Sequence, residues 1–173
     1  MIGVFDSGYG GLTVIRALCE GLPEQSFLYL GDHAAAPYGG RRNEEILELT
    51  REASERLFRM GCRLVILACN TASAVALRRL QQEWLPGAYP DRRLLGCVVP
   101  VVEAITRQPW QVDGPCASAP REPEAVAVFA TRRTVDSAAY PREIAKRAPS
   151  VTVVQQACPR LAARIEEAHP AGC

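Results

Sequence analysis

The stretch Arg63-Leu-Val-Ile-Leu-Ala-Cys-Asn-Thr-Ala-Ser73 decides the fold of this 173-residue chain. Residues 63–68 form a short apolar run, which is typical of a strand buried on both faces of a parallel sheet. Cys69 follows the run directly. After it come three side chains that commonly start a helix: Asn70, Thr71 and Ser73. The stretch therefore predicts a buried strand, a cysteine at its carboxyl end and a helix over 71–84.

The same alternation of short apolar runs and longer helical patterns continues on both sides of this stretch. Further strands are expected at 2–5, 26–30, 94–99, 125–130 and 151–155. Further helices are expected at 12–20, 43–60, shortly after Pro100, near 137–147 and at 159–168. Repeated strand–helix units with apolar strands predict an α/β fold, in which helices cover both faces of a parallel sheet.

One segment interrupts the alternation. Between about 107 and 123 the chain is rich in Pro, Gly, Ser and charged residues, and it has no apolar periodicity. This composition indicates a linker or an exposed loop. We therefore expect a first α/β domain over 1–99 and part of a second α/β domain over 100–173.

Composition narrows the classes of function. Hydrophobic residues make up 48% of the chain, and the formal net charge of +1 gives no general attraction to nucleic acid or to anionic membranes. No apolar run is long enough to span a membrane. The seven cysteines are widely spaced and the amino terminus does not resemble a signal peptide, so we expect free thiols and a cytoplasmic protein. A metal site is not expected, because His33 and His169 stand alone.

Polar residues follow several of the predicted strands. They occur at 6–8, at 31–32, at 69–71 and at 131–137. Ligands of parallel sheets bind beyond the carboxyl ends of the strands, so we expect these groups to meet in one cleft. Cys69 at a helix start would be favoured as a thiolate. The alternative is that Cys69 is a small residue of the core.

The glycine-rich turn Asp6-Ser-Gly-Tyr-Gly-Gly11 could bring backbone N–H groups close to an anion. Thr13 stands where a dinucleotide fingerprint requires its third glycine, and no P-loop pattern is present, so a small carboxylate suits the turn better. A tight turn without a ligand is the alternative. Lys146, the only lysine, lies in a predicted helix far from any phosphate loop, so chemistry at an amino-acid α-carbon would proceed without pyridoxal phosphate.

Five ordered motifs resemble those of glutamate racemases. They are Asp-Ser-Gly-Tyr-Gly-Gly-Leu at 6–12, Tyr-Leu-Gly-Asp at 29–32 with Pro-Tyr-Gly at 37–39, Ala-Cys-Asn-Thr-Ala-Ser at 68–73, Ala-Thr-Arg-Arg-Thr-Val-Asp-Ser-Ala-Ala-Tyr at 130–140 and Gln-Gln-Ala-Cys-Pro-Arg-Leu at 155–161. The resemblance implies two similar α/β domains and a cofactor-independent, two-base racemisation of glutamate for peptidoglycan synthesis. It also implies a cytoplasmic enzyme whose partner is a small-molecule substrate, and a homodimer is one expected assembly.

The resemblance also implies roles for individual residues. Cys69 is expected to be the first catalytic cysteine, with Asp6 assisting it. The expected substrate-binding residues are Asp6, Ser7, Tyr38, Gly39, Asn70, Thr71 and Thr134. Asp32 and Glu166 are expected to tune or orient the proton-transfer groups.

One family feature is missing from the sequence. The family carries its second catalytic cysteine in a Cys-Thr-His motif, and no such motif occurs here. We therefore expect an incomplete second domain, a first domain without its carboxyl-terminal return segment, and impaired racemisation. Two alternatives stay open: a related aspartate or hydantoin racemase, and a non-catalytic protein that retains only the carboxylate site.

Overall fold

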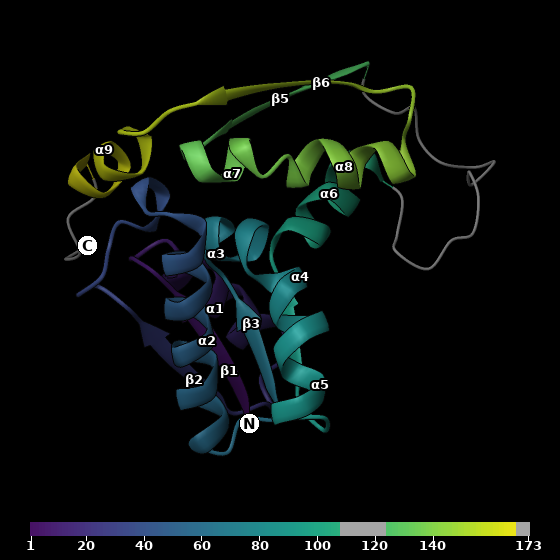
Figure 1. The fold of residues 1–173 in the computed structure, drawn as a ribbon. Coiled ribbons are helices and arrows are strands. Elements are labelled where there is room, and N and C mark those ends of the chain that lie inside the picture. Colours follow the sequence, from purple (N-terminus) through teal and green to yellow (C-terminus); the bar gives the residue numbers. More distant parts are fainter. Residues whose placement is uncertain (108–123, 169–173) are drawn as a thin grey trace.

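The computed structural model describes residues 1–107 and 124–168. Its main sheet has four parallel strands in the order β2-β1-β3-β4 (Figure 1). These strands are β1 (Ile2–Asp6), β2 (Phe27–Gly31), β3 (Leu64–Leu67) and β4 (Arg93–Gly96). A second parallel pair is formed by β5 (Ala125–Ala130) and β6 (Thr152–Ala157). The predicted α/β fold with parallel strands is confirmed.

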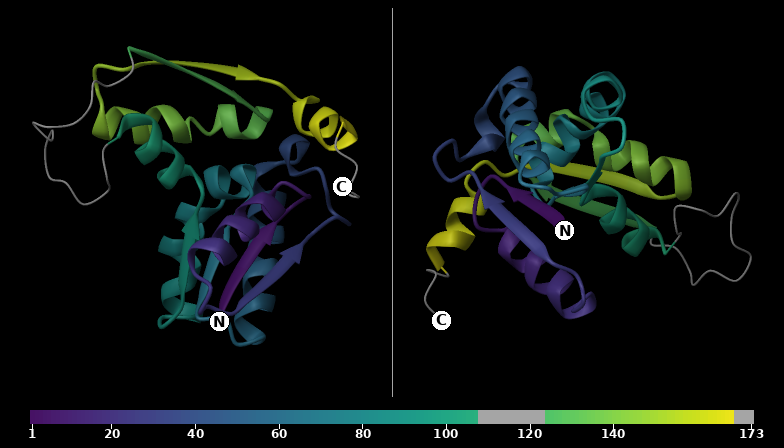
Figure 2. Two further views of the ribbon diagram at one scale, coloured as in Figure 1. Left: turned by 180° about the vertical axis from the view of Figure 1, so that it is seen from behind. Right: turned by 90° about the horizontal axis from the view of Figure 1, so that it is seen from below.

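Helices connect the strands and cover the sheets (Figures 1 and 2). The main sheet is accompanied by α1 (Gly11–Gly21), the 3₁₀ turn η1 (Tyr38–Gly40), α2 (Asn43–Arg59), α3 (Asn70–Val75), α4 (Leu77–Arg79), the π-helical turn η2 (Leu80–Trp84) and α5 (Leu85–Ala88). The second pair of strands is accompanied by α6 (Val98–Thr106), α7 (Arg132–Asp136), α8 (Ala139–Arg147) and α9 (Leu161–Ala168).

The main sheet is covered unequally on its two faces. Val65 and Leu67 of β3 are fully buried, in one core cluster with Leu57 of α2. On β4, Leu94 belongs to the same cluster and is 2% exposed, whereas the next residue, Leu95, is 51% exposed. Because successive strand side chains point to opposite faces, the face that carries Leu95 is open along this edge strand.

A second core cluster lies beneath β5 and β6. It contains Val102 of α6 and Tyr140 and Ile144 of α8, and Val126 and Val128 pack against it from the sheet. Figure 1 shows α7 and α8 on the side of this sheet that faces the first one. No described element covers the other face of β5 and β6. The large apolar side chains on that face, Phe129 and Val154, are exposed.

Three element boundaries differ from those predicted. The helix predicted over 71–84 extends to Ala88 but contains the π-helical turn η2, and Pro86 falls in the first turn of α5. The strand predicted at 94–99 ends at Gly96, because α6 already begins at Val98. The helix predicted near 137–147 is present as α8, but the separate short helix before it, α7, was not predicted.

Two further expectations concern regions rather than elements. Most of the linker predicted at about 107–123 lies outside the described residues. Within the residues that are described, no helix is long and apolar enough to cross a membrane.

Candidate active site

A cavity of about 690 Å³ lies at the carboxyl end of the main sheet. Its walls come from the loops after β1, β2 and β3, from the start of α7 and from α9, and Figure 1 shows α7 and α9 beyond that end of the sheet. The predicted catalytic cysteine, Cys69, lines it. So do most of the residues predicted to bind substrate: Asp6, Ser7, Tyr38, Gly39, Asn70 and Thr71. Side chains from segments far apart in the sequence therefore meet in one cavity.

Cys69 lies on the floor of this cavity and is 5% exposed. The Ser7 hydroxyl lies 3.0 Å from its Sγ, and the Ala72 N–H donates to Sγ at 3.4 Å as part of the cap of α3. Burial raises the pKa of the Cys69 thiol above its usual range, and the hydrogen bonds with Ser7 and Ala72 offset only part of that rise. The helix start therefore does not make the thiolate the favoured form in the free protein, contrary to the expectation from sequence.

Asp6 organises the glycine-rich turn next to Cys69. Its Oδ2 accepts the backbone N–H of Gly8 at 3.1 Å and that of Gly11 at 2.9 Å. A Cβ on Gly11 would lie 2.5 Å from the Asp6 Cβ, so this position requires glycine, whereas Gly10 has open space. The sequence suggested that these N–H groups could bind an anion, and in the structure that anion is the carboxylate of Asp6 itself.

The Tyr38 hydroxyl is hydrogen-bonded to Asp32 and is shielded from solvent. The Tyr38 hydroxyl donates to Asp32 Oδ2 at 2.8 Å, and Tyr38 is 1% exposed. Burial and this carboxylate raise the pKa of Tyr38 well above its usual range, so the phenol stays protonated. Asp32 is not among the residues that line the cavity. Asp32 therefore contacts Tyr38 from behind the cavity wall, and its expected effect on the proton-transfer groups stays a prediction.

Three threonine hydroxyls join α3 to α7. The Oγ1 atoms of Thr71 and Thr131 are 3.0 Å apart, those of Thr131 and Thr134 are also 3.0 Å apart, and Thr134 donates to Thr71 at 3.5 Å. Thr134 is fully buried and does not line the cavity, whereas Thr131 does. A Cβ on Gly39 would lie 2.7 Å from the Thr131 Cβ, so η1 packs closely on this hydroxyl cluster.

Sequence reasoning did not select Thr131 as a site residue. Its position at the end of β5 was the available signal, because it begins the 131–137 segment that was expected at the ligand-binding edge. Two arginines that follow Thr131, Arg132 and Arg133, also line the cavity. Arg133 Nε donates to the Arg41 carbonyl at 2.6 Å, which connects α7 to the loop after η1.

Two aromatic rings form part of the cavity wall. Tyr9 and His33 stack with ring centroids 4.1 Å apart, and both line the cavity. From the sequence, His33 was expected to be an isolated histidine. No sequence pattern predicts that it packs against Tyr9. Glu166, the other auxiliary residue expected, falls within α9, and its side chain lies outside the described part of the structure.

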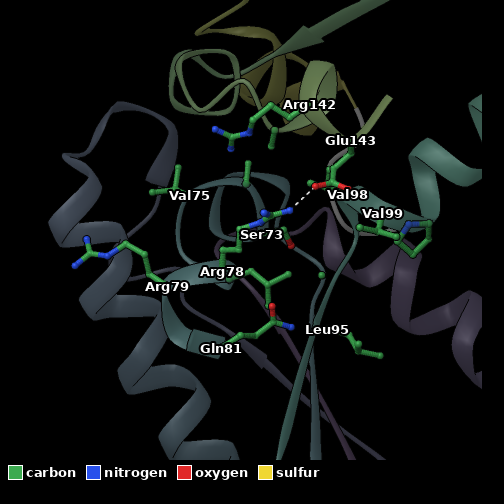
Figure 3. Close-up of a pocket in the computed structure, with 15 residues that line it drawn as sticks. Ser73, Val75, Arg78, Arg79, Gln81, Leu95, Val98, Val99, Arg142 and Glu143 are labelled. Atoms are coloured by element: carbon green, nitrogen blue, oxygen red, sulfur yellow. Dashed lines mark hydrogen bonds and ion pairs between the residues drawn. The ribbon is translucent and has the colours of Figure 1, made fainter. Parts of the chain in front are cut away.

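A second cavity, of about 510 Å³, lies beside β4 and contains no thiol among its lining residues. Figure 3 shows Arg78 of α4 ion-paired with Glu143 of α8 at its wall. Glu143 is buried and also contacts Lys146 and Arg147. This cavity is a largely apolar recess whose wall carries an ion pair between the two parts of the chain.

Two further chemical features of the described residues bear on the site. Within 1–107 and 124–168, no three His, Cys, Asp or Glu side chains gather as metal ligands would. The Lys146 ammonium lies 2.8 Å from Glu143 Oε1 and does not line the larger cavity. The functional groups that line the larger cavity include a thiol, hydroxyls, an amide, the Asp6 carboxyl, the His33 imidazole and two arginines.

Comparison with known proteins gives one consistent result. The glutamate racemase of a Caulobacter species is 52% identical over 170 residues, which cover 95% of this chain and 60% of that protein. The glutamate racemase of Ruegeria pomeroyi is 52% identical over 168 residues, with coverage of 96% and 60%. No protein-family profile matches the chain.

Solved structures agree with the sequence relatives. The chain is similar to a glutamate racemase of Bacillus anthracis with a TM-score of 0.79 and 30% identity, covering 97% of this chain and 58% of that one. It is similar to the glutamate racemase of Francisella tularensis, solved in complex with D-glutamate, with a TM-score of 0.78 and 28% identity over 99% and 58% of the two chains. The chain spans about 60% of the length of the curated relatives it matches. Sequence and fold together establish that this chain belongs to the glutamate racemase family.

Proposed function

We propose that this chain binds glutamate in the cavity at the end of the main sheet, and that Cys69 exchanges the α-proton of the bound amino acid. The observation that carries the proposal is the Ser7–Cys69 contact inside a cavity walled by hydrogen-bond donors. The family supports glutamate as the substrate, since the relatives of this chain are glutamate racemases.

Proton transfer at this site requires the Cys69 thiolate. The thiolate removes the α-proton and becomes a thiol, leaving a carbanion that the neighbouring carboxylate delocalises. Because the thiol is buried and its pKa is raised, it is a stronger base once ionised than an exposed thiol is. The same thiol can return a proton to the face from which it came. With deuterated solvent, this cycle replaces hydrogen by deuterium without inversion.

The substrate carboxylate needs donors that are already in place. The Thr71 and Thr131 hydroxyls lie together on one wall, and Asn70 begins α3 beside them. Donors placed where negative charge develops lower the barrier to carbanion formation. We assign α-carboxylate binding to Asn70, Thr71 and Thr131, with Thr134 holding Thr131 in place. Arg132 and Arg133 add positive charge to the same cavity.

Full racemisation requires a second acid on the opposite face of the substrate. The sequence has no Cys-Thr-His motif, and Cys69 is the only described cysteine that lines the cavity. This observation favours proton exchange on one face of the substrate over full racemisation. A protein that binds the carboxylate without turnover is the second candidate, favoured by the raised pKa of Cys69. The cytoplasmic location and the homodimer expected from sequence belong to the same proposal.

Proton NMR in deuterated water tests the proposal. L- and D-glutamate are incubated separately with the purified chain, with the Cys69→Ala variant and with Cys19→Ala. Cys19 is exposed and lies outside the cavity, so its variant controls for loss of a thiol. We expect loss of the α-proton signal from one enantiomer, without inversion, in the wild type and in Cys19→Ala only. L-aspartate serves as the competing substrate.

The other outcomes separate the alternatives. Exchange with inversion would mean that this chain contains a second proton donor. Faster exchange of aspartate would favour the related racemases. Saturable binding of glutamate without Cys69-dependent exchange would support the alternative that the chain is a non-catalytic carboxylate-binding protein. Neither binding nor exchange would overturn the proposed function.

A further inference from the structure

Tyr140 makes a hydrogen bond that neither the sequence motifs nor the proposed chemistry explains. Its hydroxyl donates to Asn70 Oδ1 at 2.6 Å, although 70 residues separate the two side chains. Tyr140 lies on α8 and is 7% exposed, packed in the apolar cluster that includes Val102 and Ile144. Asn70 lines the cavity as the first residue of α3. A phenol anchored in the second core therefore reaches the residue next to Cys69.

In the structure this contact accompanies one orientation of the Asn70 amide, with its oxygen toward Tyr140. A side-chain amide has one acceptor oxygen and one NH₂ donor, which lie on opposite sides of the group. When the oxygen accepts from Tyr140, the NH₂ is directed away from Tyr140. A carboxylate can only accept hydrogen bonds, so it binds an amide through the NH₂ and is repelled by the oxygen. The reversed amide would present the wrong group to an acidic ligand.

Tyr140 is suited to act as a lasting donor. Burial raises the pKa of Tyr140 to about 12, so the phenol keeps its proton at any pH at which the protein would work. The surrounding side chains of α6 and α8 are apolar and buried, which limits the rotation of the ring. The hydroxyl thus has a defined place, and it keeps the proton that it donates to the Asn70 oxygen in the structure.

We propose that Tyr140 is a positioning residue, which holds the Asn70 amide with its NH₂ toward the cavity so that it can donate to the carboxylate of the substrate. The inference rests on the proposed function, because it takes a carboxylate as the ligand. It adds that affinity for this ligand depends on α8, an element that does not line the larger cavity. Tyr140 acts only through Asn70.

The test uses Tyr140→Phe in the full chain, which removes the hydroxyl and keeps the ring. Tyr89→Phe is the matched control, since Tyr89 also donates to a side chain, Glu55, at 3.3 Å but lies outside the cavity. We measure glutamate affinity by NMR titration and stability by urea unfolding. Tyr140→Phe should weaken affinity about two- to tenfold, the range of one neutral hydrogen bond, and the Tyr89→Phe control should leave affinity unchanged.

A double-mutant cycle distinguishes positioning from general support of the fold. In an Asn70→Ala background, Tyr140→Phe should have no further effect on affinity, because nothing is left to orient. An equal loss of affinity in that background would overturn the proposal, as would unchanged affinity in the single Tyr140→Phe variant.

A measurement on the free chain keeps this test independent of the proposed function. The ¹⁵N–¹H signals of the Asn70 side-chain amide should shift in Tyr140→Phe and stay unchanged in Tyr89→Phe. An Asn70 amide that does not respond to Tyr140→Phe would overturn the positioning role, whether or not glutamate binds. A wild-type chain with responsive Asn70 signals and no affinity for glutamate would instead overturn the proposed function alone.

Discussion

The hydroxyl of Ser7 lies 3.0 Å from the sulfur of Cys69, although 62 residues separate them along the chain. Ser7 follows β1 and Cys69 follows β3, and these two strands are neighbours in the parallel sheet. Parallel strands end at the same edge, so the polar residues after them meet there. Two opposing effects act on the thiol at this point, because burial raises its pKa and the Ser7 hydroxyl lowers it.

Replacing Ser7 should therefore make Cys69 less reactive. In Ser7→Ala the thiolate loses a hydrogen bond, and such bonds to charged groups contribute about 1.5 kcal/mol or more. We expect alkylation of Cys69 by iodoacetamide at neutral pH to slow by roughly tenfold, and the rate to rise with pH in both proteins because the pKa lies above its usual value. Mass spectrometry of the labelled peptide measures the rate. Thr13→Ala, which removes an exposed hydroxyl, is the control, and equal rates in Ser7→Ala and the wild type would contradict the prediction.

Gly39 and Gly40 provide a matched pair of substitutions. A Cβ on Gly39 would lie 2.7 Å from both Cβ and Cγ2 of Thr131, whereas Gly40 has open space around it. Gly39→Ala should destabilise the chain by about 1–3 kcal/mol, as overpacking does, and should weaken glutamate binding by displacing Thr131. Gly40→Ala should change stability by less than about 1 kcal/mol. Urea unfolding of the two variants makes the comparison, and similar stabilities would show that Thr131 yields without cost.

Glu143 should contribute to stability through its buried contacts with cations. Its carboxylate meets Arg147, which is also buried, and Arg78 and Lys146, whose side chains are half exposed. Glu143→Gln should therefore destabilise the chain by about 1–3 kcal/mol, less than a fully buried pair would. Glu20→Gln removes the exposed pair with Arg16 and should cost less than about 0.5 kcal/mol. Unfolding midpoints at neutral pH provide the measurement, and equal losses in the two variants would count against a special role for Glu143.

Glu143 should also make the stability of the chain depend on pH under acidic conditions. Burial raises the pKa of Glu143, but hydrogen bonds from Lys146 and Arg147 and the charge of Arg78 outweigh burial, so the pKa lies below its usual value. A depressed pKa contributes stability above the unfolded-state pKa, and this stability is lost as pH falls through the folded-state pKa. The stability difference between wild type and Glu143→Gln should therefore shrink as the solution is acidified below about pH 4. A constant difference down to pH 2 would contradict the assignment.

Cys97 should make the stability of the chain decrease with rising pH under alkaline conditions. Burial raises the pKa of its thiol to about 11, and its Sγ contacts the Ser73 hydroxyl at 3.5 Å. A raised pKa contributes stability that is present below the unfolded-state pKa and is lost as pH rises through the folded-state value. Stability should therefore fall more steeply between about pH 9 and 11 in the wild type than in Cys97→Ala. Unfolding midpoints across this range test the expectation, and parallel profiles would refute it.

Most of the fold could be predicted from the sequence because its signals are local. The apolar run at 64–67, the polar residues after it and the glycines at 8, 10 and 11 each specify a strand end or a turn without help from distant residues. The helix after Cys69 was less predictable. Its π-helical turn lies where Trp84 packs with Phe58 and Tyr89. The spacing of apolar residues along the chain does not predict such long-range contacts.

The candidate site was predicted in part. Repeated strand–helix units indicated which residues lie at the ends of parallel strands, and so most of the cavity wall could be named in advance. The sequence could not show that Asp6 binds its own turn, that Thr131 rather than Thr134 lines the cavity, or that Tyr9 stacks on His33. Each of these facts depends on the direction of a side chain, which packing decides.

The sequence by itself thus determined the α/β class, the family motifs and the position of one cysteine at a strand end, because short-range preferences of the chain suffice for these. Only the tertiary structure decided the ionisation of Cys69 and the partners of Asn70. The pKa of a thiol depends on how much water surrounds it, and the orientation of an amide depends on a hydroxyl 70 residues away. Burial and long-range contacts of this kind arise only when distant elements pack against one another.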